Sequence, residues 1–109
     1  MMKVFISMGM RDKTIEEIRE TMNDIANTLK KRFKEDIEVI DTVVEDFENL
    51  EVENEGLYCL GKSIELLSTA DLVVFAEDWD SYRGCKIEHR CAEEYGLKIM
   101  YVSGDNIYR

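Results

Sequence analysis

Proline is absent from the chain, and so is any long run of apolar residues. Without proline, the helices are expected to continue without breaks, and no proline-rich linker divides the chain. No apolar stretch approaches the roughly 20 residues that a membrane-spanning helix needs. The 109 residues are enough for one hydrophobic core and too few for two, so we expect a single domain over residues 1–109.

Basic residues are outnumbered, because 14 lysines and arginines stand against 24 aspartates and glutamates, and the formal net charge is −10. Nucleic-acid polymers and anionic membranes attract clustered lysine and arginine, so neither is an expected partner. A small phosphate-bearing ligand is compatible with this charge, because a few backbone N–H groups at a helix N-terminus are enough to bind one phosphate.

Cysteine is also sparse, and the three residues are Cys59, Cys85 and Cys91. Their odd number, with no predicted signal peptide, indicates free thiols and a cytoplasmic location. Cys85 with His89 as base is a candidate nucleophile, although a small buried side chain is the favoured interpretation. The chain has no Cys-x-x-Cys pair, no zinc-ligand spacing and no Gly-x-Gly-x-x-Gly pattern, so we expect no metal, no NAD and no other cofactor.

The rest of the chain alternates between strand and helix patterns. Apolar residues recur every three or four positions in stretches that predict helices over residues 15–33, 57–67 and 84–95. Thr14 and Glu17 form a capping-box pair before the first helix, and Gly96 follows the last. Apolar runs predict strands at Lys3–Ser7, Ile37–Ile40, Leu72–Ala76 and Lys98–Val102, and residues Ser103–Arg109 are predicted to form a short tail.

This alternation predicts a three-layer α/β domain of the Rossmann-like or flavodoxin-like class, with a four-stranded parallel sheet and right-handed crossovers. With four strands we expect the order 2-1-3-4. The first and third strands are then neighbours whose helices leave on opposite faces of the sheet. Ligands of such sheets bind at this switch point, which the loops Met8–Lys13 and Glu77–Arg83 face.

Several residues near this switch point are candidates for function. Glu88 lies at the start of the helix after the third strand, and it is either a surface carboxylate favoured by the helix dipole or a catalytic nucleophile or base. Gly9 allows the backbone to approach a ligand, and Arg11 is a candidate for binding a phosphate or carboxylate. Trp79 and Tyr82 either stack on a base or cover the sheet edge.

The segment Glu45–Glu55 carries six carboxylates in eleven residues. It lacks the glycine-centred oxygen spacing of a calcium loop. A solvated loop or frayed helix is therefore favoured over a metal site, and a protein-interaction surface is a weaker alternative.

Three stretches carry a resemblance to a known family: Phe5–Arg11, Leu60–Asp71, and Arg83–Gly96 together with Trp79. They resemble a small bacterial and phage domain family of the nucleoside 2-deoxyribosyltransferase-like superfamily. The resemblance covers nearly the whole chain, and the third stretch is its most specific part. The superfamily includes base-exchange transferases and hydrolases of deoxynucleoside 5′-monophosphates.

The resemblance implies that Glu88 is the catalytic glutamate, which attacks C1′ of the sugar and forms a glycosyl-enzyme ester that water or a second base resolves. Asn106 is similar to an asparagine that the superfamily supplies from a neighbouring subunit, which implies a homodimer or larger homo-oligomer. The implied substrate-binding residues are Ser7, Met8, Gly9, Met10 and Arg11 for the base or phosphate, Trp79 or Tyr82 for stacking, Arg83 and Gly84 for the shape of the loop, and Ser63.

Ser63 is also where the chain departs from the superfamily, whose characterised members have an aspartate that positions the sugar or protonates the leaving base. General acid assistance is typically worth about 10²–10⁴ in rate, and a serine does not supply it. Asp71, which the resemblance matches, precedes a buried strand, and the candidate replacements are Asp78, Asp80 and His89. Two hypotheses therefore stand on one fold: N-glycosidic bond cleavage or base exchange on a (deoxy)nucleoside or its 5′-monophosphate, and a non-catalytic nucleotide-binding or sensing module.

Overall fold

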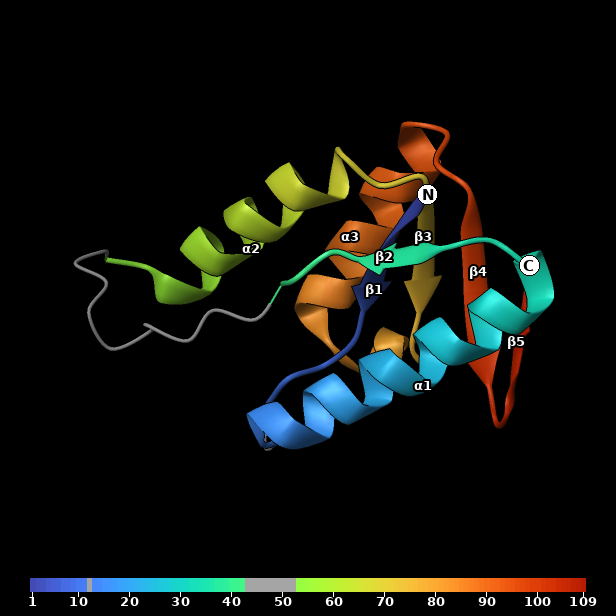
Figure 1. Cartoon of the computed structure of the whole chain (residues 1–109). Coiled ribbons are helices and arrows are strands. Elements are labelled where there is room, and N and C mark those ends of the chain that lie inside the picture. Colours follow the sequence, from blue (N-terminus) through green and yellow to red (C-terminus); the bar gives the residue numbers. More distant parts are fainter. Residues whose placement is uncertain (12, 43–52) are drawn as a thin grey trace.

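The computed structural model describes residues 1–11, 13–42 and 53–109, and Figure 1 shows their arrangement. In this part of the chain three helices cover a five-stranded sheet with the strand order β2-β1-β3-β4-β5. The elements are β1 (Met2–Ser7), α1 (Ile15–Phe33), β2 (Ile37–Val39), α2 (Glu55–Leu67), β3 (Leu72–Phe75), the 3₁₀ turn η2 (Trp79–Ser81), α3 (Arg83–Glu94), β4 (Ile99–Ser103) and β5 (Asn106–Tyr108).

The first four strands are parallel and follow the predicted order. β1 is flanked by β2 and β3, and β4 lies beyond β3. Ser7, the last residue of β1, pairs with Phe75, the last residue of β3. The carboxyl ends of these two neighbours therefore meet at one edge of the sheet, where the predicted switch point lies.

The predicted tail is wrong, because residues 103–109 add a fifth strand to the sheet. β5 pairs antiparallel with β4, so the sheet is mixed and not a four-stranded parallel one. Ser103 pairs with Asn106 across a two-residue turn, and Gly104 supplies the positive φ of 60° at its first position. Ile107 is 4% exposed and packs into the core beside α1, and Arg32 of α1 donates to its carbonyl oxygen.

The sheet is covered on both faces, which explains its continuous apolar strands. α1 lies on one face and α2 and α3 lie on the other (Figure 1). Strand residues alternate between the two sides: Val4 and Ile6 belong to the core under α1, whereas Phe5 and Phe75 belong to the core under α2 and α3. Ser7 follows this alternation and is placed on the α2 and α3 side.

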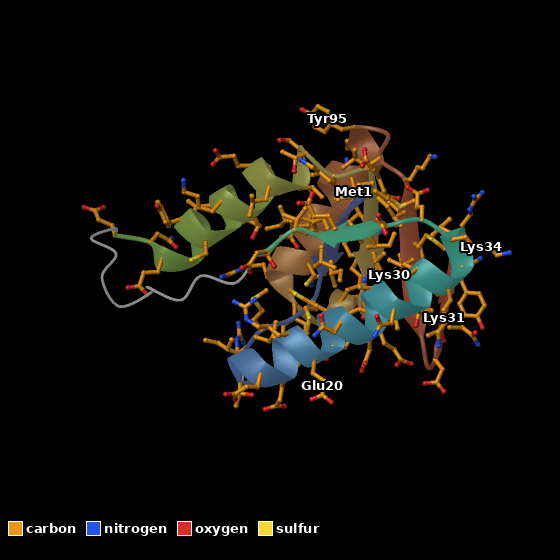
Figure 2. All side chains as sticks on the ribbon, in the orientation of Figure 1. Met1, Glu20, Lys30, Lys31, Lys34 and Tyr95 are labelled. Atoms are coloured by element: carbon orange, nitrogen blue, oxygen red, sulfur yellow. The ribbon has the colours of Figure 1, made fainter. Side chains whose placement is uncertain are left out.

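α1 begins where its capping box predicts. Thr14 Oγ1 accepts a hydrogen bond from the N–H of Glu17 at 3.1 Å, and Glu17 Oε1 accepts from the N–H of Thr14 at 3.2 Å. The helix ends at Phe33, and Lys34 follows in a left-handed conformation. Lys30, Lys31 and Lys34 project from this end (Figure 2), where positive charge favours the negative pole of the helix dipole.

No helix in the described ranges combines the length and the apolar character that a membrane crossing requires.

We predict that Ile107→Ala lowers the free energy of unfolding by about 2–5 kcal/mol, because it removes a buried side chain that β5 contributes to the core. The neighbouring Tyr108→Ala is the matched control, since Tyr108 is 52% exposed. Urea denaturation monitored by circular dichroism measures both changes. Equal unfolding midpoints for the two variants would show that β5 does not pack against the core.

Candidate functional site

A cavity of about 450 Å³ opens at the carboxyl end of β1. Its wall combines the β1–α1 loop, the start of α1, Thr42 beyond β2, one side of α2 and the first turns of α3. The volume lies within the range typical of small-molecule sites. The cavity brings together all but two of the predicted site residues: Ser7–Arg11, Ser63, Tyr82–Gly84 and Glu88.

Glu88 and Ser7 form the buried polar centre of this cavity. Ser7 Oγ donates a hydrogen bond to Glu88 Oε1 at 2.7 Å, and the two residues are 1% and 7% exposed respectively. Ser7 was expected to contact a ligand, but in the structure its hydroxyl is directed at Glu88. The hydrogen bond links the last residue of β1 to the second turn of α3.

Burial raises the pKa of the Glu88 carboxyl, and the hydrogen bond from Ser7 lowers it to a smaller extent. A carboxylate taken out of water loses hydration, whereas a donor that points at it stabilises the charged form. The net result is a Glu88 carboxyl whose pKa lies above its ordinary value. A carboxyl of this kind at a cavity wall is typical of functional sites.

Cationic groups surround the outer part of the cavity. Arg11, Lys13 and Arg83 are in its wall, and among the described residues Glu88 is the only carboxylate there. Lys13 Nζ donates to the carbonyl oxygen of Gly9 at 2.8 Å and lies 3.6 Å from a carboxylate oxygen of Asp78. The cavity therefore carries a positive balance on a protein that is strongly acidic overall.

Tyr82 closes the cavity against the β1–α1 loop. A Cβ atom added to Gly9 would lie 2.0 Å from Cζ of Tyr82, so only glycine leaves room for this ring. Lys13 Nζ lies 5.4 Å from the centre of the same ring, within the range of a cation–π contact. Gly9, Lys13 and Tyr82 thus fix the two switch-point loops against each other.

The N-terminus of α3 opens into the same cavity. Tyr82 is the N-cap, and no side chain of the described residues caps this end of the helix. A Cβ atom on Gly84 would meet nothing within 4 Å. The first backbone N–H groups of α3 therefore have no side-chain cap from the described residues, and they lie next to open space at Gly84, which is an arrangement suited to binding anions.

Trp79 does not line the cavity, and of the two roles left open for it, base stacking and covering the sheet, its contacts fit the second. Its ring stacks on His89 with centroids 4.2 Å apart and contacts Phe75 and Tyr101. His89 Nε2 shares a hydrogen bond of 2.6 Å with the Tyr101 hydroxyl. This aromatic cluster packs α3 and η2 against β3 and β4, so the ring of Trp79 is used in packing.

Asn106 also lies away from the cavity, on β5. It lines a second cavity on the α1 side of the sheet together with Asp24 and Asp105. Its expected role in a neighbouring subunit stays a prediction.

None of the candidate replacements for the missing aspartate reaches the Glu88 cavity. Asp71, the residue that the resemblance matches, is also elsewhere, since it exchanges hydrogen bonds with the backbone of Lys3 at the amino end of the sheet. Asp78 pairs with Lys13 outside the cavity, and Asp80 is exposed in η2. His89 belongs to the aromatic cluster, where its Nδ1 lies 3.2 Å from Glu93 Oε1. Ser63 itself lines the cavity, and its role in substrate binding stays a prediction.

Cys85 lines the cavity and is 4% exposed. Burial raises the pKa of its thiol above the ordinary value; a hydrogen bond with Ser7 opposes this, and the carboxylates of Glu88 and Asp78 add to it. The thiol therefore stays protonated, and His89 is engaged elsewhere. These observations favour the small buried side chain over the nucleophile.

Lys13, Thr42 and Cys59 are cavity residues that were not singled out from the sequence. Lys13 closes a loop that was predicted to face the switch point. Cys59 stands four residues before Ser63 and so shares its side of α2. Thr42 follows β2. The only signal that could have identified it is the predicted strand order, which places the end of β2 beside the end of β1.

In the described residues no group of three or more His, Cys, Asp and Glu side chains is arranged to hold a metal ion. Comparisons with known protein families, with curated proteins and with solved structures found no match. The fold itself defines an α/β protein with a mixed five-stranded sheet, compatible with the Rossmann-like class.

We predict that Gly9→Ala lowers the free energy of unfolding by about 1–3 kcal/mol, because the new methyl group overlaps the Tyr82 ring. The cost should largely disappear when Gly9→Ala is made together with Tyr82→Ala, since the two side chains are in direct contact. Gly61→Ala is the control, because its methyl group meets nothing within 4 Å. An equal cost of Gly9→Ala in both backgrounds would contradict the contact.

We also predict that Glu88→Gln raises the free energy of unfolding at pH 7 and that the gain shrinks as the pH falls. Because the pKa of Glu88 is raised in the folded state, its favourable contribution is present at low pH and is lost as the pH rises through that pKa. One pKa unit corresponds to about 1.4 kcal/mol. The amide oxygen of the variant still accepts the hydrogen bond from Ser7.

Thermal unfolding from pH 4 to pH 8 measures this effect. The control is Glu20→Gln, an exposed carboxylate on α1 (Figure 2). A gain for Glu88→Gln that is the same at every pH, or a loss of stability at pH 7, would show that burial does not disfavour the charged form of Glu88.

Proposed function

We propose that the chain cleaves or exchanges the N-glycosidic bond of a (deoxy)nucleoside or its 5′-monophosphate, with the Glu88 carboxylate as nucleophile. The observation that carries this proposal is the position of Glu88, which is 7% exposed and lies in the wall of the cavity at the switch point. Burial of a carboxylate is costly, so one kept beside a cavity is a functional-site candidate. The resemblance to the nucleoside 2-deoxyribosyltransferase-like superfamily supports the same assignment.

The proposed reaction has two steps. In the first, an ionised oxygen of Glu88 forms a bond to C1′ of the sugar, the C1′–N bond breaks, and its electron pair leaves with the base, which takes a proton from water. In the second, water or another base attacks C1′, the ester bond to Glu88 breaks, and the carboxylate is regenerated. Water releases its proton to solvent and yields the free sugar, whereas a second base yields a new nucleoside.

The cationic part of the cavity suits a 5′-phosphate. The uncapped N-terminus of α3 offers backbone N–H groups next to the open space at Gly84. Arg11 and Lys13 lie in the same wall, on the β1–α1 loop. Tyr82 presents an aromatic ring to the cavity, and such a ring is suited to stacking on a base.

The lack of an acidic side chain to protonate the departing base limits the rate of this reaction. Ser63 lines the cavity but is not an acid, and the described residues supply no second carboxylate to the wall. The loss of general acid assistance is typically worth about 10²–10⁴ in rate. We therefore expect turnover to be slow, and fastest for bases that leave most readily without protonation.

The lack of a second carboxylate among the described residues of the cavity wall favours a second candidate function, a nucleotide-binding or sensing module without turnover. A raised pKa favours the protonated form of Glu88, which is not a nucleophile, and the cavity retains its cationic and backbone donors in either case. The weaker alternative, a protein-interaction surface at Glu45–Glu55, lies outside the described residues except for 53–55.

A homodimer or larger homo-oligomer stays a prediction. α2 supports it by exposing apolar side chains, since Leu57 and Tyr58 are 64% and 37% exposed. Exposed apolar groups on adjacent positions are common at protein interfaces.

Incubation with a panel of 2′-deoxynucleosides and their 5′-monophosphates should release free base, measured by chromatography. Release should fall by at least about 10³-fold in Glu88→Gln, because the nucleophile is removed, and should be unchanged in the exposed Glu20→Gln. Release should also rise with pH through the raised pKa of Glu88, since the carboxylate is the reactive form.

Two other outcomes are informative. Nucleotide binding without base release would favour the sensing module over the enzyme. Base release that persists in Glu88→Gln would remove Glu88 from the role of nucleophile.

A further inference from the structure

Thr42 has a buried hydroxyl group with no hydrogen-bond partner among the described residues. The residue is 8% exposed, and its Oγ1 forms no hydrogen bond with the described residues. Among the described residues, Thr42 Oγ1 is the only buried side-chain nitrogen or oxygen atom without a hydrogen bond. Buried polar groups are nearly always hydrogen-bonded, so an orphaned hydroxyl indicates a partner that the described residues do not provide.

The position of Thr42 shows where that partner would lie. Thr42 follows β2, whose Val39 pairs with Val4 of β1, and the N–H of Ile40 donates to the carbonyl oxygen of Val4 at 2.9 Å. The chain beyond Ile40 therefore leaves β2 beside the carboxyl half of β1, which ends at Ser7. Thr42 lines the same cavity as Glu88. A ligand that fills this cavity is therefore a candidate partner for the Thr42 hydroxyl.

The chemistry of this side of the cavity indicates which part of the ligand it contacts. Besides Thr42, the cavity wall includes Cys59, Leu60 and Ser63 of α2, none of which is charged. Arg83 reaches the first turn of α2, where its Nη2 lies 3.7 Å from the position of a Cβ atom on Gly56. A phosphate is better served by Arg11, Lys13 and the N-terminus of α3. A threonine hydroxyl both donates and accepts, which matches the ring nitrogens, carbonyl and amino groups on the edge of a heterocyclic base.

We propose that Thr42 Oγ1 hydrogen-bonds to the heterocyclic base of the ligand in the Glu88 cavity. The assignment rests on the proposed function for the chemical class of the ligand. Thr42 is then a binding residue that selects among bases, because a base whose facing edge has no polar atom leaves the hydroxyl unsatisfied.

Two substitutions separate the hydroxyl group from the shape of the side chain. Thr42→Val keeps the shape and removes the hydroxyl, whereas Thr42→Ser keeps the hydroxyl. All variants are made in full-length Glu88→Gln, so that bound nucleotide is not consumed. Thr28→Val is the matched control, because the Thr28 hydroxyl donates to the carbonyl oxygen of Asp24 on α1 and is not in the wall of the Glu88 cavity.

The probes are 2′-deoxynucleoside 5′-monophosphates with different bases and 2-deoxyribose 5-phosphate, and calorimetry measures their dissociation constants. Thr42→Val should weaken binding of the preferred nucleotide about 3- to 10-fold, the effect of one lost neutral hydrogen bond. It should reduce the difference in dissociation constant between nucleotides with different bases, and it should leave binding of 2-deoxyribose 5-phosphate unchanged. Thr42→Ser should bind nearly as well as the parent.

Thermal unfolding without ligand supplies the second readout. Thr42→Val should unfold at the same or a higher temperature than the parent, because it removes an unsatisfied buried hydroxyl. A lower unfolding temperature with unchanged nucleotide binding would overturn the proposal and show that the hydroxyl bonds within the protein. Equal weakening of nucleotide and sugar phosphate would also overturn it, because the hydroxyl would then contact the sugar or phosphate.

The two proposals fail in different ways. If the wild-type protein binds nucleotide but releases no free base, catalysis by Glu88 is contradicted. The comparison of the Thr42 variants stays valid in that case. Nucleotide that binds equally to the Thr42 variants contradicts the base contact alone. The absence of any nucleotide binding at millimolar concentration contradicts both.

Discussion

The hydrogen bond from Ser7 to Glu88 joins the end of the central strand to the helix that follows the neighbouring strand. It fixes the Glu88 carboxyl at the wall of the cavity and opposes part of the rise in its pKa that burial causes. Ser7 is held in turn by the pairing of β1 with β3, where it lies opposite Phe75. The carboxyl is therefore positioned by the sheet, the most rigid part of the fold, although the two residues are 81 positions apart in the chain.

α3 connects this site to the core because one side of the helix lines the cavity and the other packs against the aromatic cluster. Glu88 and Cys85 are turned to the cavity, whereas His89 is packed among Trp79, Phe75 and Tyr101. The aromatic cluster anchors α3 and η2 to the strands, so the loop that carries Tyr82 begins from a fixed point. At the cavity mouth, Gly9 accommodates the ring of Tyr82 and Lys13 lies beside it. Packing on one side of the helix thus sets the geometry of the cavity wall on the other.

Local patterns predicted most of the fold, and contacts between distant segments account for what they missed. The period of α1 and its capping box set its limits, and the alternation of elements gave the order of the four parallel strands. β5 was missed because a three-residue strand carries little pattern, and its burial depends on α1. Most site residues follow from the switch-point rule. The partner of Ser7, the burial of Trp79 in an aromatic cluster and the orphaned hydroxyl of Thr42 depend on tertiary contacts that no local pattern encodes.

A crystal structure of the Glu88→Gln protein soaked with a 2′-deoxynucleoside 5′-monophosphate tests the central claim most directly, because the claim concerns which atoms of a ligand lie against residue 88. We expect the nucleotide to occupy the cavity between α2 and α3, with C1′ of its sugar in contact with the side chain at position 88 and its phosphate near the N-terminus of α3. A nucleotide bound only elsewhere, such as in the second cavity beside Asn106, or with its sugar turned away from position 88, would show that Glu88 is not the nucleophile.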